Sequence, residues 1–360
     1  MSTFATSPLM TPTCHQPTTL AGTREFLHGL DTWLGSDDGY SAGWSLQWHS
    51  APHDTWSTAE DHRWSRWISR ILPGLDDDGA GGRVVRRNWR LSQIIVTPTD
   101  ITIPEPQPED LPWGGTLGIH TSWLSFDNER LNAFQIYAGC VGPCAHAEEV
   151  QTFVHRDLGF AETPQGWDNQ LANAPLFNVN YGARRKLLTA PADRHTPGIF
   201  ANDLSAGGQV ALGNLFTLAH TDIEWRLGWG LPEGFTHIPD PAGYGIAMAP
   251  GMRKDESGWA AFVSAMARMS YIAHAALIEG GETANGGYHP GVDYEKTPFE
   301  VLIGVHLAKG RFSRHLMYHY FPGGLFDTPD GASVDWINLS LEWRFGWRAP
   351  PAARPATDPE

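Results

Sequence analysis

Alternation of apolar and polar positions is the dominant pattern in this chain. It recurs in segments of strand length separated by Gly, Pro, Asn and Asp turns, which predicts antiparallel β-structure. The last segment shows the alternation clearly, with Leu339, Leu341, Trp343 and Phe345 at every second position, whereas several others alternate less regularly. The predicted strands are 25–33, 40–49, 83–96, 114–126, 130–141, 177–188, 199–212, 216–229, 259–272, 299–307, 311–321 and 336–347.

These twelve segments predict an all-β fold, a closed antiparallel transmembrane β-barrel of about 12 strands over residues 24–347. An even strand number with alternately short and long connections is typical of bacterial barrels. Residues 1–23, rich in Ser, Thr and Pro, are expected to form a disordered leader, and the Pro/Ala-rich residues 348–360 a disordered tail. The leader contains no basic start followed by an apolar core, so no signal peptide is visible in the sequence.

One helix of about three turns is expected over residues 145–158, directly after the Gly142-Pro143 turn. Gln151 and His155 stand four residues apart in it, so their side chains share a helix face. A neutral imidazole can take a proton from water, and a neighbouring amide can orient that water or the ring. The spacing alone names no chemistry, and on spacing alone a surface or structurally satisfied histidine is the favoured interpretation.

A second, shorter helix is expected over residues 61–72, where Trp64 and Trp67 are three positions apart. Such an amphipathic segment either packs against the rest of the fold or lies against lipid.

Composition narrows the class of protein. Sixteen tryptophans and 39 glycines in 360 residues suit antiparallel β-structure, either a membrane barrel with aromatic girdles or an aromatic-rich soluble sandwich, and composition alone favours the sandwich. No apolar run reaches the length of about 18 residues that a transmembrane helix needs, so a membrane-spanning form would have to be a barrel. A net charge of −15 argues against a nucleic-acid partner, which requires clustered positive charge.

Three cysteines are present, too few for a zinc set. Cys140 and Cys144 flank a three-residue turn and could pair in an oxidising compartment, leaving Cys14 over. Two unpaired thiols are the equal alternative.

Several short motifs together resemble one protein family. Gly142-Pro143, the stretch 148–151 followed by His155, and Gly-Trp-Asp-Asn-Gln-Leu at 166–171 resemble the signature of the outer-membrane lipid A deacylases, the 3′-O-deacylases. Tyr-Ser-Ala-Gly at 40–43 is similar to the family's Tyr-Thr-Asn/Ala-Gly. Residues 97–110 are similar to its Tyr-Thr-Pro-x-Asp-Ile and Asp-Arg-Pro segments. The resemblance runs from residue 26 to 347 and is densest over 96–181.

The resemblance implies a hydrolase that removes ester-linked 3′-acyl chains from lipid A, with calcium as cofactor, acting on lipopolysaccharide in the bacterial outer membrane. His155 falls on the family's general base and Gln151 on the residue that orients the water or the ring. Ser41 takes the position of the family's hydroxyl residue, and Asp31 that of a calcium ligand. Trp167 is expected to have a positioning role, packing the helix against the wall.

Three polar positions of the family pattern are absent. Leu30 stands in place of an amide, Leu111 in place of an arginine, and residues 101–108 contain no Lys or Arg. The final strand is also followed by a tail, where the family ends on an aromatic residue. Two alternatives to the deacylase therefore stay open: a non-catalytic structural or lipid-binding barrel, and another calcium-dependent lipid esterase such as a phospholipase.

Overall fold

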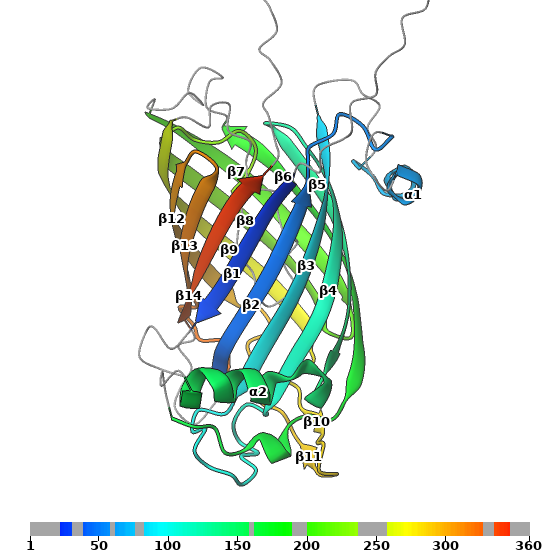
Figure 1. Ribbon diagram of the computed structural model, residues 1–360, viewed down its shortest axis with the longest axis vertical. Coiled ribbons are helices and arrows are strands. Elements are labelled where there is room, and N and C mark those ends of the chain that lie inside the picture. The colour runs from blue at the N-terminus through cyan, green and yellow to red at the C-terminus, as the bar shows by residue number, and fades with distance from the viewer. Residues whose placement is uncertain are drawn as a thin grey trace, which may run out of the picture.

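The computed structural model describes residues 22–30, 39–57, 62–75, 83–157, 162–188, 200–236, 258–326 and 335–345, and of residues 22–30, 39–42, 62 and 345 it describes the backbone alone. Long antiparallel strands form a tall curved wall (Figure 1). They are β1 (Gly22–Leu30), β2 (Gly39–Ser50), β3 (Val84–Thr97), β4 (Gly114–Phe126), β5 (Arg130–Val141), β6 (Ala174–Leu188), β7 (Phe200–Gly213), β8 (Phe216–Trp229), β9 (Trp259–Ala275), β12 (Phe299–Lys309), β13 (Phe312–Tyr320) and β14 (Asp335–Phe345).

Each strand pairs with its neighbours along the chain, except that β9 pairs with β12. The segment between those two contains β10 (Gly281–Glu282) and β11 (Tyr288–His289), a separate two-stranded sheet that the alternation pattern did not predict. β1 pairs antiparallel with both β14 and β2, so the first and last strands of the chain are hydrogen-bonded neighbours. The predicted all-β antiparallel fold is confirmed.

The two faces of the wall differ in polarity, as strand β12 shows. Ile303, Val305 and Leu307 point outward and are 44–51% exposed, while the alternate residues Leu302 and His306 are fully buried inside. Successive side chains on a strand point to opposite faces, so the other strands also alternate between outward-facing and inward-facing residues. The outer face carries rows of exposed aliphatic and aromatic side chains, and the inner face carries polar and charged ones.

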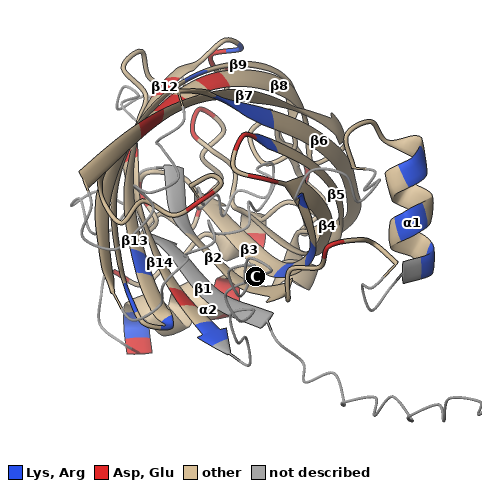
Figure 2. Cartoon of the chain, turned by 90° about the horizontal axis from the view of Figure 1, so that it is seen from above, with Lys and Arg blue, Asp and Glu red and all other residues tan. Residues whose placement is uncertain are grey.

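Charged side chains inside the wall are paired with one another. Arg226 Nε lies 2.8 Å from Asp203 Oδ1, and Lys186 Nζ lies 2.7 Å from Asp203 Oδ2. Arg268 Nη1 lies 2.9 Å from Glu300 Oε2, whose other oxygen is 2.6 Å from His319 Nδ1. Figure 2 shows charged positions along β7, β8, β9 and β12 when the wall is viewed from above. A buried charge needs such partners, since an unpaired one is strongly destabilising.

One end of the wall is closed by loops. The segments 98–113, 142–173 and 276–298 meet there, joined by Leu171 N–H to the Trp113 carbonyl, 2.8 Å, and Ala284 N–H to the Gln170 carbonyl, 2.8 Å. An apolar core lies between the strands and the loops at this end, and Leu111 is fully buried in it. Its other buried members include Ile94, Tyr137, Leu171, Leu176, Leu215, Phe216, Leu277, Ile278, Phe321 and Trp336.

The opposite end carries the first residue of β1 and the last of β14, which are register partners. Helix α1 (His62–Ile71) stands beside the wall at that end (Figures 1 and 2). It coincides with the helix predicted over 61–72. Among the described helices, none is both long and apolar enough to cross a bilayer.

The predicted leader and tail fall outside the described residues, apart from Gly22 and Thr23, which belong to β1. The first strand therefore begins three residues before Glu25, where the alternation was expected to start.

Candidate functional site

The candidate site is built on the connection that follows β5. A 3-10 turn (Pro143–Ala145) leads into helix α2 (Ala147–Thr152), which continues as a π-helical turn (Phe153–Asp157). The helix predicted over 145–158 is therefore present, with a widened last turn that the spacing did not predict. π-helical turns are rare in proteins, and those that occur are often found at functional sites. His155 lies in this turn.

Helix α2 crosses the outer face of the wall at the loop end (Figure 1). On β3, Trp89 is exposed on the outer face, and Gln93 and Ile95 follow it at even spacing, so they share that face. Gln93 Nε2 donates to the Ala145 carbonyl at 2.6 Å, and Ile95 packs in one apolar cluster with Ala147. The helix thus rests on outward-facing side chains of β3.

A glycine on β4 allows the close approach of the helix. A Cβ placed on Gly115 would lie 2.2 Å from Ala147 Cβ, a distance at which the two atoms overlap. Any larger residue at 115 would push α2 away from the wall. Sequence analysis did not identify Gly115 or Gln93 as contributors to the site, and only their strand positions could have suggested it.

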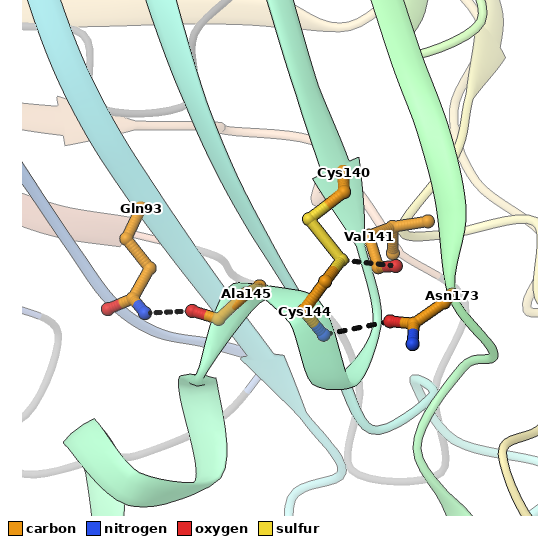
Figure 3. The surroundings of a disulfide bond; sticks show 6 residues. All are labelled: Gln93, Cys140, Val141, Cys144, Ala145 and Asn173. Carbon is orange, nitrogen blue, oxygen red and sulfur yellow. Dashed lines mark hydrogen bonds between the residues drawn. A yellow bond between two sulfur atoms is a disulfide. The ribbon is translucent and has the colours of Figure 1, made fainter.

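A disulfide joins Cys140, near the end of β5, to Cys144 in the turn before α2, with the two Cα atoms 6.4 Å apart (Figure 3). The Cys144 N–H donates to Asn173 Oδ1 at 2.8 Å. Together with the Gln93 contact, these bonds fix the start of the helix on two sides. Of the two alternatives that the sequence left open for this pair, the structure has the bonded one.

Gln151 is 2% exposed and its amide is held by a single tryptophan. The Trp167 indole Nε1–H donates to Gln151 Oε1 at 2.9 Å, and Gln151 Nε2 has no hydrogen-bond partner among the described residues. Trp167 begins a short 3-10 turn (Trp167–Asn169) and packs edge-on against Trp113, with ring centroids 5.1 Å apart. The predicted packing role of Trp167 is confirmed, and its hydrogen bond to Gln151 adds a specific contact.

His155 is 5% exposed, and its Nδ1 lies 2.8 Å from the Glu162 carbonyl oxygen. A carbonyl only accepts, so Nδ1 carries the hydrogen and the lone pair of the neutral ring is on Nε2. This backbone contact fixes the ring orientation and the tautomer. It is the arrangement in which a histidine can accept a proton through Nε2.

The remaining predicted site residues are less fully described. Asp31 lies outside the described residues. The backbone of Ser41 lies at an irregularity in the β2–β3 ladder, between Tyr40, which pairs with Val96, and Ala42, which pairs with Ile95. Since Ile95 also packs against α2, the fold brings the Ser41 backbone to the same end and the same strands as the helix.

Carboxylates near the start of α2 form a separate, exposed group. At Glu148 a partial loss of solvent, together with the nearby charges of Glu149 and Asp168, raises the pKa of the carboxyl group. Within the described ranges, no set of three or more His, Cys, Asp or Glu side chains is placed to hold a metal ion.

An apolar outer face, a polar, ion-paired inner face and an aromatic-rich wall define an outer-membrane β-barrel type of protein. Consistent with this class, the family model described as outer membrane protein LpxR matches residues 4–345. The chain therefore belongs to the LpxR family of outer membrane proteins, and the family resemblance found in the sequence is confirmed.

One solved structure agrees on the fold. LpxR from Salmonella typhimurium is similar over 90% of this chain and 100% of its own, with 17% identity and a TM-score of 0.66. The β domain of the Bordetella autotransporter BrkA covers 91% and 99%, with 11% identity and a TM-score of 0.41. No curated protein sequence matches the chain.

Proposed function

We propose that this protein is an outer-membrane hydrolase that removes ester-linked 3′-acyl chains from lipid A, with His155 as the general base. The observation that carries the proposal is the fixed His155 ring, whose Nδ1 is bonded to the Glu162 carbonyl at 2.8 Å. Ester hydrolysis needs an activated water and stabilisation of the oxyanion, and Nε2 is the basic atom that such a ring provides. Family membership supports lipid A as the substrate.

In this proposal Gln151 orients the water or the imidazole, and Trp167 holds Gln151. The amide oxygen is occupied by the indole N–H, which leaves the two Nε2 hydrogens as the groups able to contact water or substrate. Ser41 would contribute a hydroxyl from the β2–β3 irregularity.

Calcium is part of the same proposal, with Asp31 as a ligand. A bound calcium ion would supply positive charge to the anionic lipid and to the developing oxyanion. The described residues offer no cluster of three carboxylate or imidazole ligands, so the other ligands would have to be hydroxyl, amide or carbonyl oxygens. We expect chelation to abolish hydrolysis, and Asp31→Ala to lose activity that partly returns at raised calcium.

The deciding experiment is mass spectrometry of lipid A incubated with the purified protein. His155→Ala should lower the rate of 3′-acyl release by ~10²–10⁴, as expected for removal of a general base. His146→Ala is the matched control, because His146 is an exposed histidine at the start of the same helix. Both variants should keep the folded, heat-modifiable barrel band on electrophoresis. Near-normal acyl release by His155→Ala would refute the assignment.

A second candidate function is a non-catalytic, lipid-binding barrel. It is favoured by Leu111, which stands in place of the family's arginine and is fully buried in the apolar core rather than at a polar site. If the folded wild type releases no acyl chain from lipid A or phospholipid in calcium, this second function is the better one. Release from phospholipid alone would instead identify the third candidate, a calcium-dependent phospholipase.

We further propose that the wall is a closed, twelve-strand transmembrane barrel, with β1 as the closing strand. Its register partners support this, since Leu27 is paired with Ser340 on β14. In a Cys14→Ser background, a Leu27→Cys/Ser340→Cys pair should cross-link on oxidation, whereas Leu27→Cys/Asn338→Cys, two residues out of register, should not. Equal cross-linking of the two pairs would contradict closure at β1.

A further inference from the structure

Helix α1 has three distinct faces, set by its side-chain spacing. Ser65, Ile68 and Ser69 are buried, whereas Trp64 is 69% and Trp67 56% exposed. Ile71, 57% exposed, follows Trp64 and Trp67 at helical spacing, so these three form one apolar face. Arg63, Arg66 and Arg70 have the same i, i+3, i+7 spacing and form a basic face next to it.

The buried face fixes the helix on the outer wall. Ser65 Oγ accepts from Arg87 Nη1 at 3.2 Å and from the Trp123 indole N–H at 3.1 Å. Arg87 also lies over the Trp123 ring, with its Cζ 4.1 Å from the centroid. Ile68 packs in an apolar cluster with Trp56 and Trp123. The helix therefore contacts the wall through Ser65 and Ile68. Its exposed apolar face does not take part in that contact and is held in a fixed position beside the wall.

The neighbouring wall is also aromatic on its outer face. Trp48 and Trp89 are register partners on β2 and β3, and both are exposed, at 38% and 42%. Further exposed aromatic residues lie near the same ends of other strands: Phe200, Trp229, Trp259, Phe312 and Trp343. Aromatic residues at this level form the girdle that marks a membrane–water interface in outer-membrane barrels. The apolar face of α1 continues that girdle away from the wall.

We propose that α1 is an interfacial helix that lies in the headgroup layer of the surrounding bilayer and binds anionic phospholipid headgroups through its arginines. In a protein of net charge −15, this ten-residue helix contains three arginines and no acidic residue. The arginine positions complement a negatively charged surface, while Trp64, Trp67 and Ile71 match the apolar boundary beneath it. The helix would then fix the depth of the barrel in the bilayer at the end where β1 begins and β14 ends (Figure 1).

The test places an environment-sensitive dye on the exposed apolar face. Ile71→Cys in a Cys14→Ser background offers one reactive thiol, since Cys140 and Cys144 are bonded to each other. The full chain is labelled with nitrobenzoxadiazole and reconstituted into vesicles of phosphatidylcholine alone or with phosphatidylglycerol. Quenching by lipid carrying a doxyl group near the headgroup reports the buried fraction of the dye. Trp67→Cys serves as a second probe position.

Quenching should be strongest in the phosphatidylglycerol vesicles. Arg63→Gln/Arg70→Gln should lower the ratio of lipid-bound to water-exposed helix about 25-fold, which is about fivefold per charge removed. Added salt should lower the same ratio. Arg311→Gln/Arg314→Gln is the matched control, because it removes two exposed arginines that are not on α1. It should leave the quenching unchanged.

Two outcomes would overturn the proposal. Absence of quenching at both probe positions in the folded wild type would mean that the helix stays in water. Equal quenching in both lipid mixtures, unaffected by Arg63→Gln/Arg70→Gln, would remove the anionic headgroup as the partner. None of these readouts depends on hydrolytic activity.

Discussion

Replacement of Trp167 by phenylalanine tests how the candidate site is held together. The variant keeps an aromatic ring against Trp113 but removes the indole N–H that donates to Gln151 Oε1 at 2.9 Å. Because Gln151 is 2% exposed and its Nε2 has no partner among the described residues, the amide then loses its anchoring bond without gaining water. A buried acceptor left unsatisfied costs about 1–3 kcal/mol.

That cost corresponds to an increase of about 5- to 150-fold in local opening of α2, since each 1.4 kcal/mol is a factor of ten. Hydrogen exchange measured by mass spectrometry on a peptide spanning 147–157 should speed up by this factor. The rate of acyl release should fall as well, because Gln151 is no longer oriented. Trp113→Phe is the matched control, since it replaces the other indole of the same pair by a smaller ring. The Trp113 indole N–H has no hydrogen-bond partner among the described residues, so this variant removes no hydrogen bond to them.

The comparison of the two variants decides the question. If Trp167→Phe and Trp113→Phe accelerate exchange equally, the indole bond to Gln151 contributes nothing beyond ring packing. If neither accelerates it, α2 is held by the disulfide and Gln93 alone.

Other predictions concern the interior, the loops and the disulfide. Asp203→Asn should destabilise the barrel by about 3–5 kcal/mol, because Arg226 and Lys186 would stay buried without their carboxylate. The measurement is the temperature at which the folded band is lost on electrophoresis, and an unchanged temperature would contradict it. Burial lowers the pKa of His289 more than the Gln107 carbonyl and the Asp110 carboxylate raise it. Its Nε2 is bonded to that carbonyl at 3.0 Å, and Nδ1 accepts from Gly291 N–H at 3.1 Å, so protonation breaks a bond. The contribution of His289 to stability is therefore complete above its unfolded pKa of about 6.5 and is lost as the pH falls through the lower, folded value. Proteolysis of the 276–298 loop should be faster at pH 5 than at pH 7.5, and His289→Asn should remove the difference. Reduction of the Cys140–Cys144 bond should increase hydrogen exchange at the start of α2 and leave the strands protected. Unchanged exchange at α2 after reduction would show that the Gln93 hydrogen bond is enough to hold the start of the helix.

Strand positions could be predicted from the sequence because alternation is a local property. The predicted ranges 114–126, 130–141 and 216–229 match the bounds of β4, β5 and β8. The short strands β10 and β11 were missed, since two residues cannot show a period. The π-helical turn was missed for a different reason. Helical spacing does not encode a widened turn, nor the hydrogen bond that His155 in this turn makes to the Glu162 carbonyl.

The candidate site was predicted in part, through family motifs rather than through physical pattern. His155, Gln151 and Trp167 lie in one short motif-bearing stretch and are all buried together at the wall. The residues that hold them come from distant strands. Gln93 and Gly115 carry no chemical signature, and their contribution depends on β3 and β4 passing directly beneath α2. Asp31 lies outside the described residues, so its assignment stays a prediction.

The location of α2 on the outer face of the wall has a kinetic consequence. For the proposed lipid substrate, approach would be sideways within the leaflet, and the molecule would not need to leave the bilayer before reaching His155. Encounter is then a two-dimensional search, and its frequency depends on the mole fraction of substrate in the surface. Dilution with inert lipid or detergent at constant bulk substrate would slow such an enzyme, whereas dilution with buffer would not.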